Sequence, residues 1–244
     1  MLPIVYRDEH FIAIDKPAGL LVHRSDLDRH ETRFAVQLLR DQIGAQVFPV
    51  HRLDRGTSGV LLFALHRDAL VAASQAFELN QVSKAYVAVV RGWPPEDGSI
   101  DHPLRRLRDA HESAIGRDQA QAARTDFTRL STVSLPIRVD AYPESRYALV
   151  RLQPLTGRRH QLRRHLKHIA HPIIGDTTYG KGRHNRMFQE QFGCHRLLLA
   201  SVSLALAHPI SGTPLHIEAS PSADFQSLLS QLGWPAYHEA AHRG

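Results

Sequence analysis

The run of side chains best suited to chemistry lies at residues 51–59, which read HRLDRGTSG. Glycines in such a loop let the backbone approach a bound ligand closely. Asp54 could act there as a nucleophile, because its neighbours Arg52 and Arg55 keep a carboxylate ionised and a partly dry pocket makes it more reactive. Spacing alone favours a simpler interpretation, an Asp-Arg surface pair that caps a turn, since such pairs are usually structural.

A short basic helix supplies the second group of candidate residues. Its cations are Arg158, Arg159, Arg163, Arg164 and Lys167. Three of them recur at four-residue spacing and therefore share one side of a helix. Leu162 and Leu166 direct the opposite face inward, so we expect Arg163 to point into a cleft. The pattern indicates contacts to phosphate, and a solvated basic face is the alternative.

Two other patterns suggest chemistry less well. Four histidines, at positions 160, 165, 168 and 171, lack the spacing and the accompanying acid or cysteine of a zinc helix, so no metal is expected and these side chains should face solvent or RNA. Ser58 lies near His51 in sequence, but no G-x-S-x-G elbow surrounds it. We therefore interpret Thr57 and Ser58 as hydrogen-bonding groups that shape the loop.

Composition favours a polyanionic partner. The 244-residue chain carries a formal net charge of +6, which favours nucleic acid without requiring it. A single cysteine, Cys194, excludes an internal disulfide framework and fits a reducing compartment. We see neither a signal peptide nor an apolar stretch long enough to cross a bilayer, and expect a soluble cytoplasmic protein.

The spacing of hydrophobic residues predicts the strands and helices that position these candidate residues. Predicted strands cover residues 11–14, 60–65, 86–90, 146–153, 197–206 and 215–219, and predicted helices cover 32–43, a segment capped by Asp68, a segment opening at Thr156-Gly157, and 223–232. Residues 105–124 show no period and suggest a long mobile loop. Interleaved strands and helices without a linker predict one α+β domain over residues 1–244, with a central mixed, mainly antiparallel sheet.

The loop at 51–59 resembles the HRLDxxTSG signature of RluA-type pseudouridine synthases. Three further segments resemble the family in the same order: DKPAG at 15–19, SKAYVA at 83–88 and TGRRHQLR at 156–163. Nine such residues in one motif are unlikely by chance. The resemblance spans most of the chain and implies the pseudouridine synthase fold without a separate S4-type RNA-binding domain.

The resemblance also implies residue roles. Asp54 matches the aspartate on which these enzymes depend, Tyr86 the tyrosine that packs against the target uracil, and Arg163 the basic residue that pairs with the aspartate. Arg52 matches the arginine that fills the gap left by a flipped nucleotide, and extrusion of the base is required because a side chain cannot reach a uridine inside a stem. Whether Asp54 attacks C6 or C1′, and whether Tyr86 is a base or an aromatic wall, stays open.

Within the family, residues 21–29 and 183–196 resemble a subgroup that modifies tRNA at uridine 65, between the T stem and the acceptor stem. The implied enzyme is an isomerase that needs no cofactor and works on tRNA as a monomer, without an obligate protein partner. We expect Arg52 and Arg55, with Arg158, Arg159, Arg164 and Lys167, to contact RNA. The alternatives are a sibling enzyme acting on ribosomal RNA or another tRNA site, and a basic RNA-binding protein without activity. The presence of Asp54, Tyr86 and Arg163 weighs against the last.

Overall fold

The computed structural model describes residues 1–23, 32–107 and 119–239. Its strands are β1 (Ile4–Arg7), β2 (Phe11–Lys16), β3 (Phe48–Pro49), β4 (Ser58–Ala64), β5 (Ser83–Arg91), β6 (Asp97–Asp101), β7 (Leu104–Arg105), β8 (Ala120–Gln121), β9 (Arg124–Leu135), β10 (Ser145–Pro154), β11 (Leu199–Ala207) and β12 (Pro214–Glu218). Its helices are α1 (Ala35–Ile43), α2 (Arg67–Glu78), α3 (Gln161–His168), α4 (Gly182–Phe192) and α5 (Ala223–Gln231).

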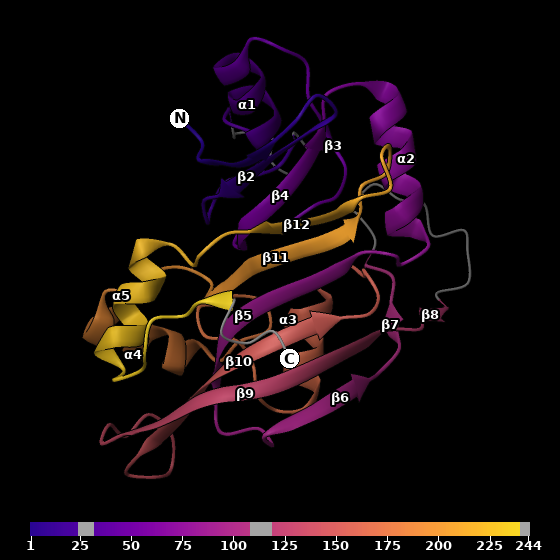
Figure 1. Cartoon of the computed structure of the whole chain (residues 1–244). Helices are drawn as coiled ribbons and strands as arrows, with labels where there is room; N and C mark the ends of the chain where they lie inside the picture. Colours follow the sequence, from indigo (N-terminus) through magenta and orange to yellow (C-terminus); the bar gives the residue numbers. More distant parts are fainter. Residues whose placement is uncertain (24–31, 108–118, 240–244) are drawn as a thin grey trace.

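One large twisted sheet organises the molecule (Figure 1). Its strand order is β1-β2-β4-β11-β5-β10-β9-β6, with β12 paired to β11 and β3 to β4. Among the described strands β4 and β11 run parallel, and the other pairs are antiparallel. The predicted α+β fold with a mixed, mainly antiparallel sheet is confirmed.

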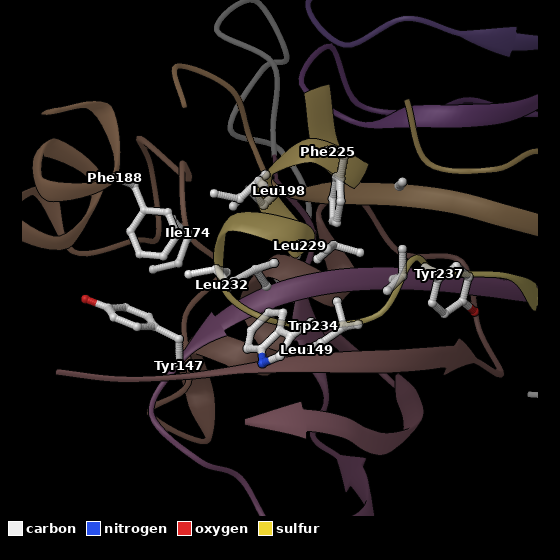
Figure 2. Close-up of a cluster of buried hydrophobic side chains, with 14 of the residues drawn as sticks. Tyr147, Leu149, Ile174, Phe188, Leu198, Phe225, Leu229, Leu232, Trp234 and Tyr237 are labelled. Carbon is white, nitrogen blue, oxygen red and sulfur yellow. The ribbon is translucent and has the colours of Figure 1, made fainter. Parts of the chain in front are cut away.

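Period-two alternation on the central strands divides the core between the two faces of the sheet. On β5, Val87 and Val89 pack in one cluster with α4 and α5, while Ala88 and Val90 pack in another with α3. The first of these clusters is closed by aromatic side chains that follow α5, including Trp234 (Figure 2). The catalytic candidates lie on the α3 face.

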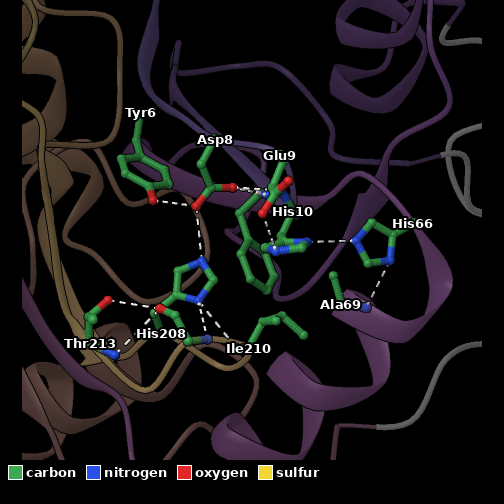
Figure 3. Close-up of polar contacts among 11 residues, drawn as sticks. Tyr6, Asp8, Glu9, His10, His66, Ala69, His208, Ile210 and Thr213 are labelled. Carbon is green, nitrogen blue, oxygen red and sulfur yellow. Dashed lines mark hydrogen bonds and ion pairs between the residues drawn. The ribbon is translucent and has the colours of Figure 1, made fainter.

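Polar contacts tie the β1–β2 edge of the sheet to distant segments (Figure 3). Asp8 in the β1–β2 turn accepts hydrogen bonds from the backbone of His10 at 2.7 Å and of Phe11 at 2.6 Å. Its other oxygen lies 2.9 Å from Nε2 of His208, which follows β11. A second pair joins His10 to His66 at 2.9 Å, at the start of α2. The hairpin is thereby fixed at both ends of its turn.

Helix ends follow the expected chemistry with one correction. Gly44 and Gly193 end α1 and α4 in the left-handed conformation, at φ 67° and 62°, which glycine adopts without strain. Asp68 was expected to cap α2, but the cap is His66, whose side chain accepts from the Ala69 backbone N–H. The prediction was wrong because residue 66 already has extended backbone dihedrals, which places Asp68 inside the first turn.

The sequence missed some elements and misjudged others. Strand β9 was not predicted, although it pairs with β10 along ten positions. Helix α4 and strand β6 were also not predicted. The segment 105–124 includes β8 and ends at β9, and its residues 108–118 lie outside the described part of the chain.

Candidate active site

Asp54 lies in the loop that leads into β4. Its carbonyl accepts a hydrogen bond from the Thr57 backbone at 3.0 Å, which closes the turn, and its side chain is 25% exposed. Strand β4 then meets β11 so closely that a Cβ on Gly59, at φ +103°, would lie 1.9 Å from the Ser201 carbonyl oxygen. Glycine is therefore required at this position of the signature.

Lys16, at the end of β2, connects the Asp54 loop to the segment that follows β2. This fully buried ammonium donates to the carbonyl oxygens of Pro17, Leu20 and Arg55, at 3.0, 2.8 and 3.2 Å. Burial lowers the pKa of Lys16 to about 7, and the nearby Asp54 carboxylate opposes that shift. The DKPAG segment and the signature loop are thus one connected unit.

Arg163 reaches Asp54 from the first turns of α3. Its Nη1 lies 3.1 Å from Oδ2 of Asp54, which is a charge-assisted hydrogen bond. His160, with a left-handed backbone at φ 56°, places Nε2 3.8 Å from Oδ1 of the same carboxylate. The expected pairing of Arg163 with Asp54 is present, across 109 residues of sequence.

Arg163 has a second carboxylate partner, Asp176, which sequence reasoning missed. Nε and Nη2 of Arg163 donate to the two oxygens of Asp176 at 2.7 and 2.9 Å. Burial would raise the pKa of Asp176, but hydrogen bonds from Arg163 and from backbone amides outweigh it and hold that pKa below its usual value. A useful signal was present in the sequence: an acid between glycines at 175 and 180, beyond the basic helix.

Tyr86 projects from β5 onto the same face of the sheet, where it packs against the clusters beside α1 and α3. Burial raises the pKa of Tyr86 to about 12, with a smaller contribution from the Asp54 charge, while a hydrogen bond with Ser201 opposes the rise. Ser201 itself is paired with Gly59 on one side and with Tyr86 on the other. Strand β11 therefore sets the spacing between Asp54 and Tyr86.

A basic groove opens beside these residues. It has a volume of about 200 Å³ and is lined by Arg52, Leu104, Arg105, Arg106, Leu107, Gln121, Arg158, Arg159 and Arg164. Four of the six arginines were predicted RNA contacts, and the other two are Arg105 on β7 and Arg106, which follows it. Arg55 and Lys167 are not among its lining residues: Arg55 donates to the Gly19 carbonyl at 3.1 Å, and the Lys167 ammonium lies 5.7 Å from the Tyr179 ring centre.

The histidine interpretation needs one correction. His165 was expected at the surface, but it is fully buried, with Nδ1 2.9 Å from the Thr125 hydroxyl and Nε2 3.0 Å from the His102 carbonyl. It lies on the core-facing side of α3, since residues 162, 165, 166 and 169 share one face. His51 and Ser58 have different hydrogen-bond partners. The His51 ring accepts from the Leu62 N–H at 3.1 Å, and the Ser58 hydroxyl accepts from Arg196 at 2.6 Å.

Comparison with known proteins decides the family. A family model described as RNA pseudouridylate synthase matches residues 10–168, which include Asp54, Tyr86 and Arg163. The chain belongs to this family. It is an enzyme of the pseudouridine synthase class, and its RluA-type signature is the one expected from the sequence. Pseudouridine synthases isomerise uridine in RNA to pseudouridine.

Full-length relatives and solved structures agree with that membership. The chain is 49% identical over 236 residues to tRNA pseudouridine synthase C of Vibrio cholerae, covering 96% of this chain and 97% of the relative. It is 48% identical to the Yersinia pestis protein of the same name, covering 96% and 92%. Human RNA Pseudouridylate Synthase Domain Containing 4 superposes with a TM-score of 0.70 at 26% identity, covering 95% of this chain and 93% of that one.

Two further expectations concern the segment at residues 21–29 and membrane-spanning helices. Most of the 21–29 segment, which resembled the tRNA-modifying subgroup, lies outside the described residues. In the part of the chain that the structure describes, no helix is long and apolar enough to cross a membrane.

Proposed function

We propose that this synthase converts a uridine of tRNA to pseudouridine, with Asp54 as its nucleophile. The observation that supports the proposal most directly is the arrangement around that carboxylate, which lies 3.1 Å from the Arg163 guanidinium in a loop bordered by the arginine groove. The tRNA substrate rests on relatives about half identical over nearly the whole chain, whose names specify tRNA. The proposed target is uridine 65, as the subgroup resemblance implies.

The reaction keeps every atom of the substrate. The bond between N1 and C1′ breaks, a bond between C5 and C1′ forms, the C5 proton leaves, and N1 gains a proton. No electron acceptor or group donor enters this balance. Asp54 forms a transient covalent bond, either to C6 of the ring or to C1′ of the ribose, and this bond breaks again before the product leaves. Loss of the C5 proton restores the uracil ring.

Arg163 and His160 determine how that carboxylate is presented. Arg163 donates to Oδ2 of Asp54 at 3.1 Å and fixes its position, while the His160 ring faces Oδ1 at 3.8 Å. A nucleophile held at a defined angle needs less reorganisation when the base arrives. The arginines adjacent in sequence, Arg52 and Arg55, are exposed, so the charge that supports Asp54 comes from α3.

Tyr86 is better suited to be an aromatic surface for the target uracil than a general base. A phenol with a pKa of about 12 stays protonated near neutral pH and cannot accept the C5 proton without first ionising. Its ring offers the target uracil a stacking surface. Exposed Arg52, on the rim of the groove, is suited to stack in the gap left by the extruded nucleotide, and the remaining groove arginines are suited to bind phosphates.

The catalytic part of the proposal is tested with Asp54→Asn. This isosteric change should abolish pseudouridine formation in a transcribed tRNA while leaving tRNA binding within a few fold, because the phosphate-binding arginines are untouched. Pseudouridine is measured by tritium release from C5-labelled transcript, and binding by filter retention. Turnover at the wild-type rate would refute the assignment of Asp54.

The substrate part is tested separately by mapping pseudouridine in total RNA from cells lacking the gene. We expect loss of the modification at tRNA uridine 65 and its return when the wild-type gene is restored. The Asp54→Asn gene is the matched control and should not restore it. A signal lost only from ribosomal RNA would overturn the tRNA proposal and favour the sibling-enzyme alternative.

A further inference from the structure

The turn between α3 and α4, residues 175–180, contains a carboxylate whose bonding is complete. Asp176 has no exposed side-chain surface. Its Oδ2 accepts from Nε of Arg163 at 2.7 Å, and its Oδ1 accepts from Nη2 of Arg163 and from the Thr178 and Tyr179 backbone amides, each at 2.9 Å. Four donors therefore fix the position of this carboxylate.

These contacts leave Arg163 one orientation. Two of its nitrogens, Nε and Nη2, are engaged in the fork to Asp176, and the third, Nη1, faces Asp54 at 3.1 Å. Burial would lower the pKa of Arg163, but the hydrogen bonds and charge of Asp176 outweigh it and raise that pKa. Since a guanidinium is planar and rigid, fixing one edge on Asp176 aims the other edge at Asp54.

The same turn also reaches the second group beside Asp54. The Tyr179 hydroxyl lies 3.0 Å from Nδ1 of His160. Burial raises the pKa of Tyr179, so its phenol remains a hydrogen-bond donor near neutral pH. A phenol that donates to Nδ1 selects the tautomer with the proton on Nε2, the nitrogen that faces Asp54. The Tyr179 ring centre also lies 5.0 Å from the Arg163 guanidinium carbon.

Helix α4 and two glycines hold the turn in place. The buried Asn185 side chain donates to the Asp176 carbonyl at 2.9 Å and accepts from the Gly175 amide at 2.8 Å. A Cβ on Gly175, at φ +80°, would lie 1.8 Å from the Arg196 carbonyl oxygen, and one on Gly180 would lie 2.2 Å from the Asp176 carbonyl oxygen. Segment 183–196, whose role the sequence did not reveal, therefore anchors the turn.

From this geometry we propose that Asp176 and Tyr179 are positioning residues that hold Arg163 and His160 against the Asp54 carboxylate. Neither is asked to touch the substrate. The inference rests on the proposed role of Asp54 and extends it. The Arg163 hydrogen bond at 3.1 Å and the His160 contact at 3.8 Å that the nucleophile receives are both set by one turn, which lies outside the matched family segment 10–168.

Asp176→Asn is the direct test. The asparagine oxygen can keep the two backbone amides, so the turn is preserved, while its NH₂ group opposes Nε of Arg163. We expect the single-turnover rate on transcribed tRNA to fall about 10- to 100-fold, the usual cost of losing an outer-layer orienting group, with tRNA affinity within about twofold of wild type. Introduced into Arg163→Ala, the same change should slow the reaction no further, because it acts through Arg163.

Tyr179→Phe is the second variant and removes one hydroxyl from a partly exposed ring. It should slow single turnover several fold, and that loss should vanish in a His160→Ala background. Glu239→Gln is the control: Glu239 is also a buried carboxylate, 2.6 Å from Arg151, and Arg151 pairs across the sheet with Val87 of the α4–α5 face, not with Tyr86. Its loss should lower the melting temperature and leave the single-turnover rate unchanged.

The outcomes separate the two proposals. Wild-type rates in both Asp176→Asn and Tyr179→Phe, with Asp54→Asn inactive, would overturn the positioning role alone. Full activity in Asp54→Asn would overturn the proposed function beneath it. Rate losses that add fully to those of Arg163→Ala and His160→Ala would show that the turn acts by another route and would also overturn the inference. If Asp176→Asn does not fold, the Tyr179 and His160 pair decides.

Discussion

Replacing Arg163→Ala should destabilise the fold far more than replacing its catalytic partner. Asp176 has 0% exposed side-chain surface and Arg163 only 10%, so removal of the guanidinium leaves a charge that water cannot reach. Breaking a buried ion pair in this way costs about 3–5 kcal/mol. For a chain of this length that loss corresponds to a fall in melting temperature of about 10 °C.

The matched variant is Asp54→Asn, which removes the other carboxylate from the same arginine. Asp54 is 25% exposed, and the bidentate pair of Arg163 with Asp176 survives its loss. We therefore expect a change in unfolding free energy within about 1 kcal/mol, as for partly solvated pairs. Urea denaturation followed by circular dichroism at pH 7 measures both variants.

The pH dependence supplies a further check on Arg163→Ala. In the wild type Arg163 helps to lower the pKa of Asp176, so that pair contributes stability above the unfolded pKa and loses it as pH falls. Without Arg163, burial dominates and Asp176 protonates more readily, which relieves the uncompensated charge. The stability gap between wild type and variant should narrow from pH 7 to pH 4. Equal stability of the Arg163 and Asp54 variants, or a widening gap, would refute this reasoning.

Three more perturbations follow from the structure. Gly59→Ala places a Cβ 1.9 Å from the Ser201 carbonyl oxygen and should cost more than about 3 kcal/mol by urea denaturation, whereas Gly44→Ala, with nothing within 4 Å, should cost about 1. Burial lowers the pKa of His51 to about 3, so below pH 6.5 the unfolded chain binds a proton on His51 that the folded chain does not. The free energy of unfolding should therefore fall by about 2 kcal/mol between pH 7 and pH 5 in the wild type, and this fall should be absent in His51→Asn. Arg159→Gln should reduce the salt slope of tRNA binding by about 1, a result that an unchanged slope would contradict.

The sequence was sufficient to predict most of the central strands and both members of the ion pair between Asp54 and Arg163. Alternation and apolar runs predicted the strands β4, β5, β10 and β11. The spacing of Leu162 and Leu166 predicted which face of α3 packs on the core, and from it that Arg163 points into the cleft. Strand β9 was missed because ten of its twelve residues are at least partly exposed, and seven of those ten are polar, so its hydrophobic alternation is weak.

The partners of the site residues were harder to predict because they depend on tertiary contacts. The glycines around Asp176 mark a turn, but they do not show that its carboxylate is buried: its importance comes from meeting Arg163 after α3 has packed on the sheet. Likewise the arginines beside Asp54 in sequence are exposed, while Arg163, which donates to its carboxylate, comes from 109 residues away. Periodicity assigns faces to elements, but it does not say which loops meet at their ends.

The place of β11 has a consequence for how activity is acquired during folding. This strand comes late in the chain, yet it separates β4 from β5, and so divides the segment bearing the nucleophile from the strand bearing the tyrosine. Without β11, no described strand pairing joins the β1-β2-β4 part of the sheet to the β5-β10-β9-β6 part, so the Asp54 loop and Tyr86 belong to separate parts. Long-range closure of this kind is slow. An intermediate lacking the β11 insertion could therefore retain native-like hairpins and be unable to modify RNA.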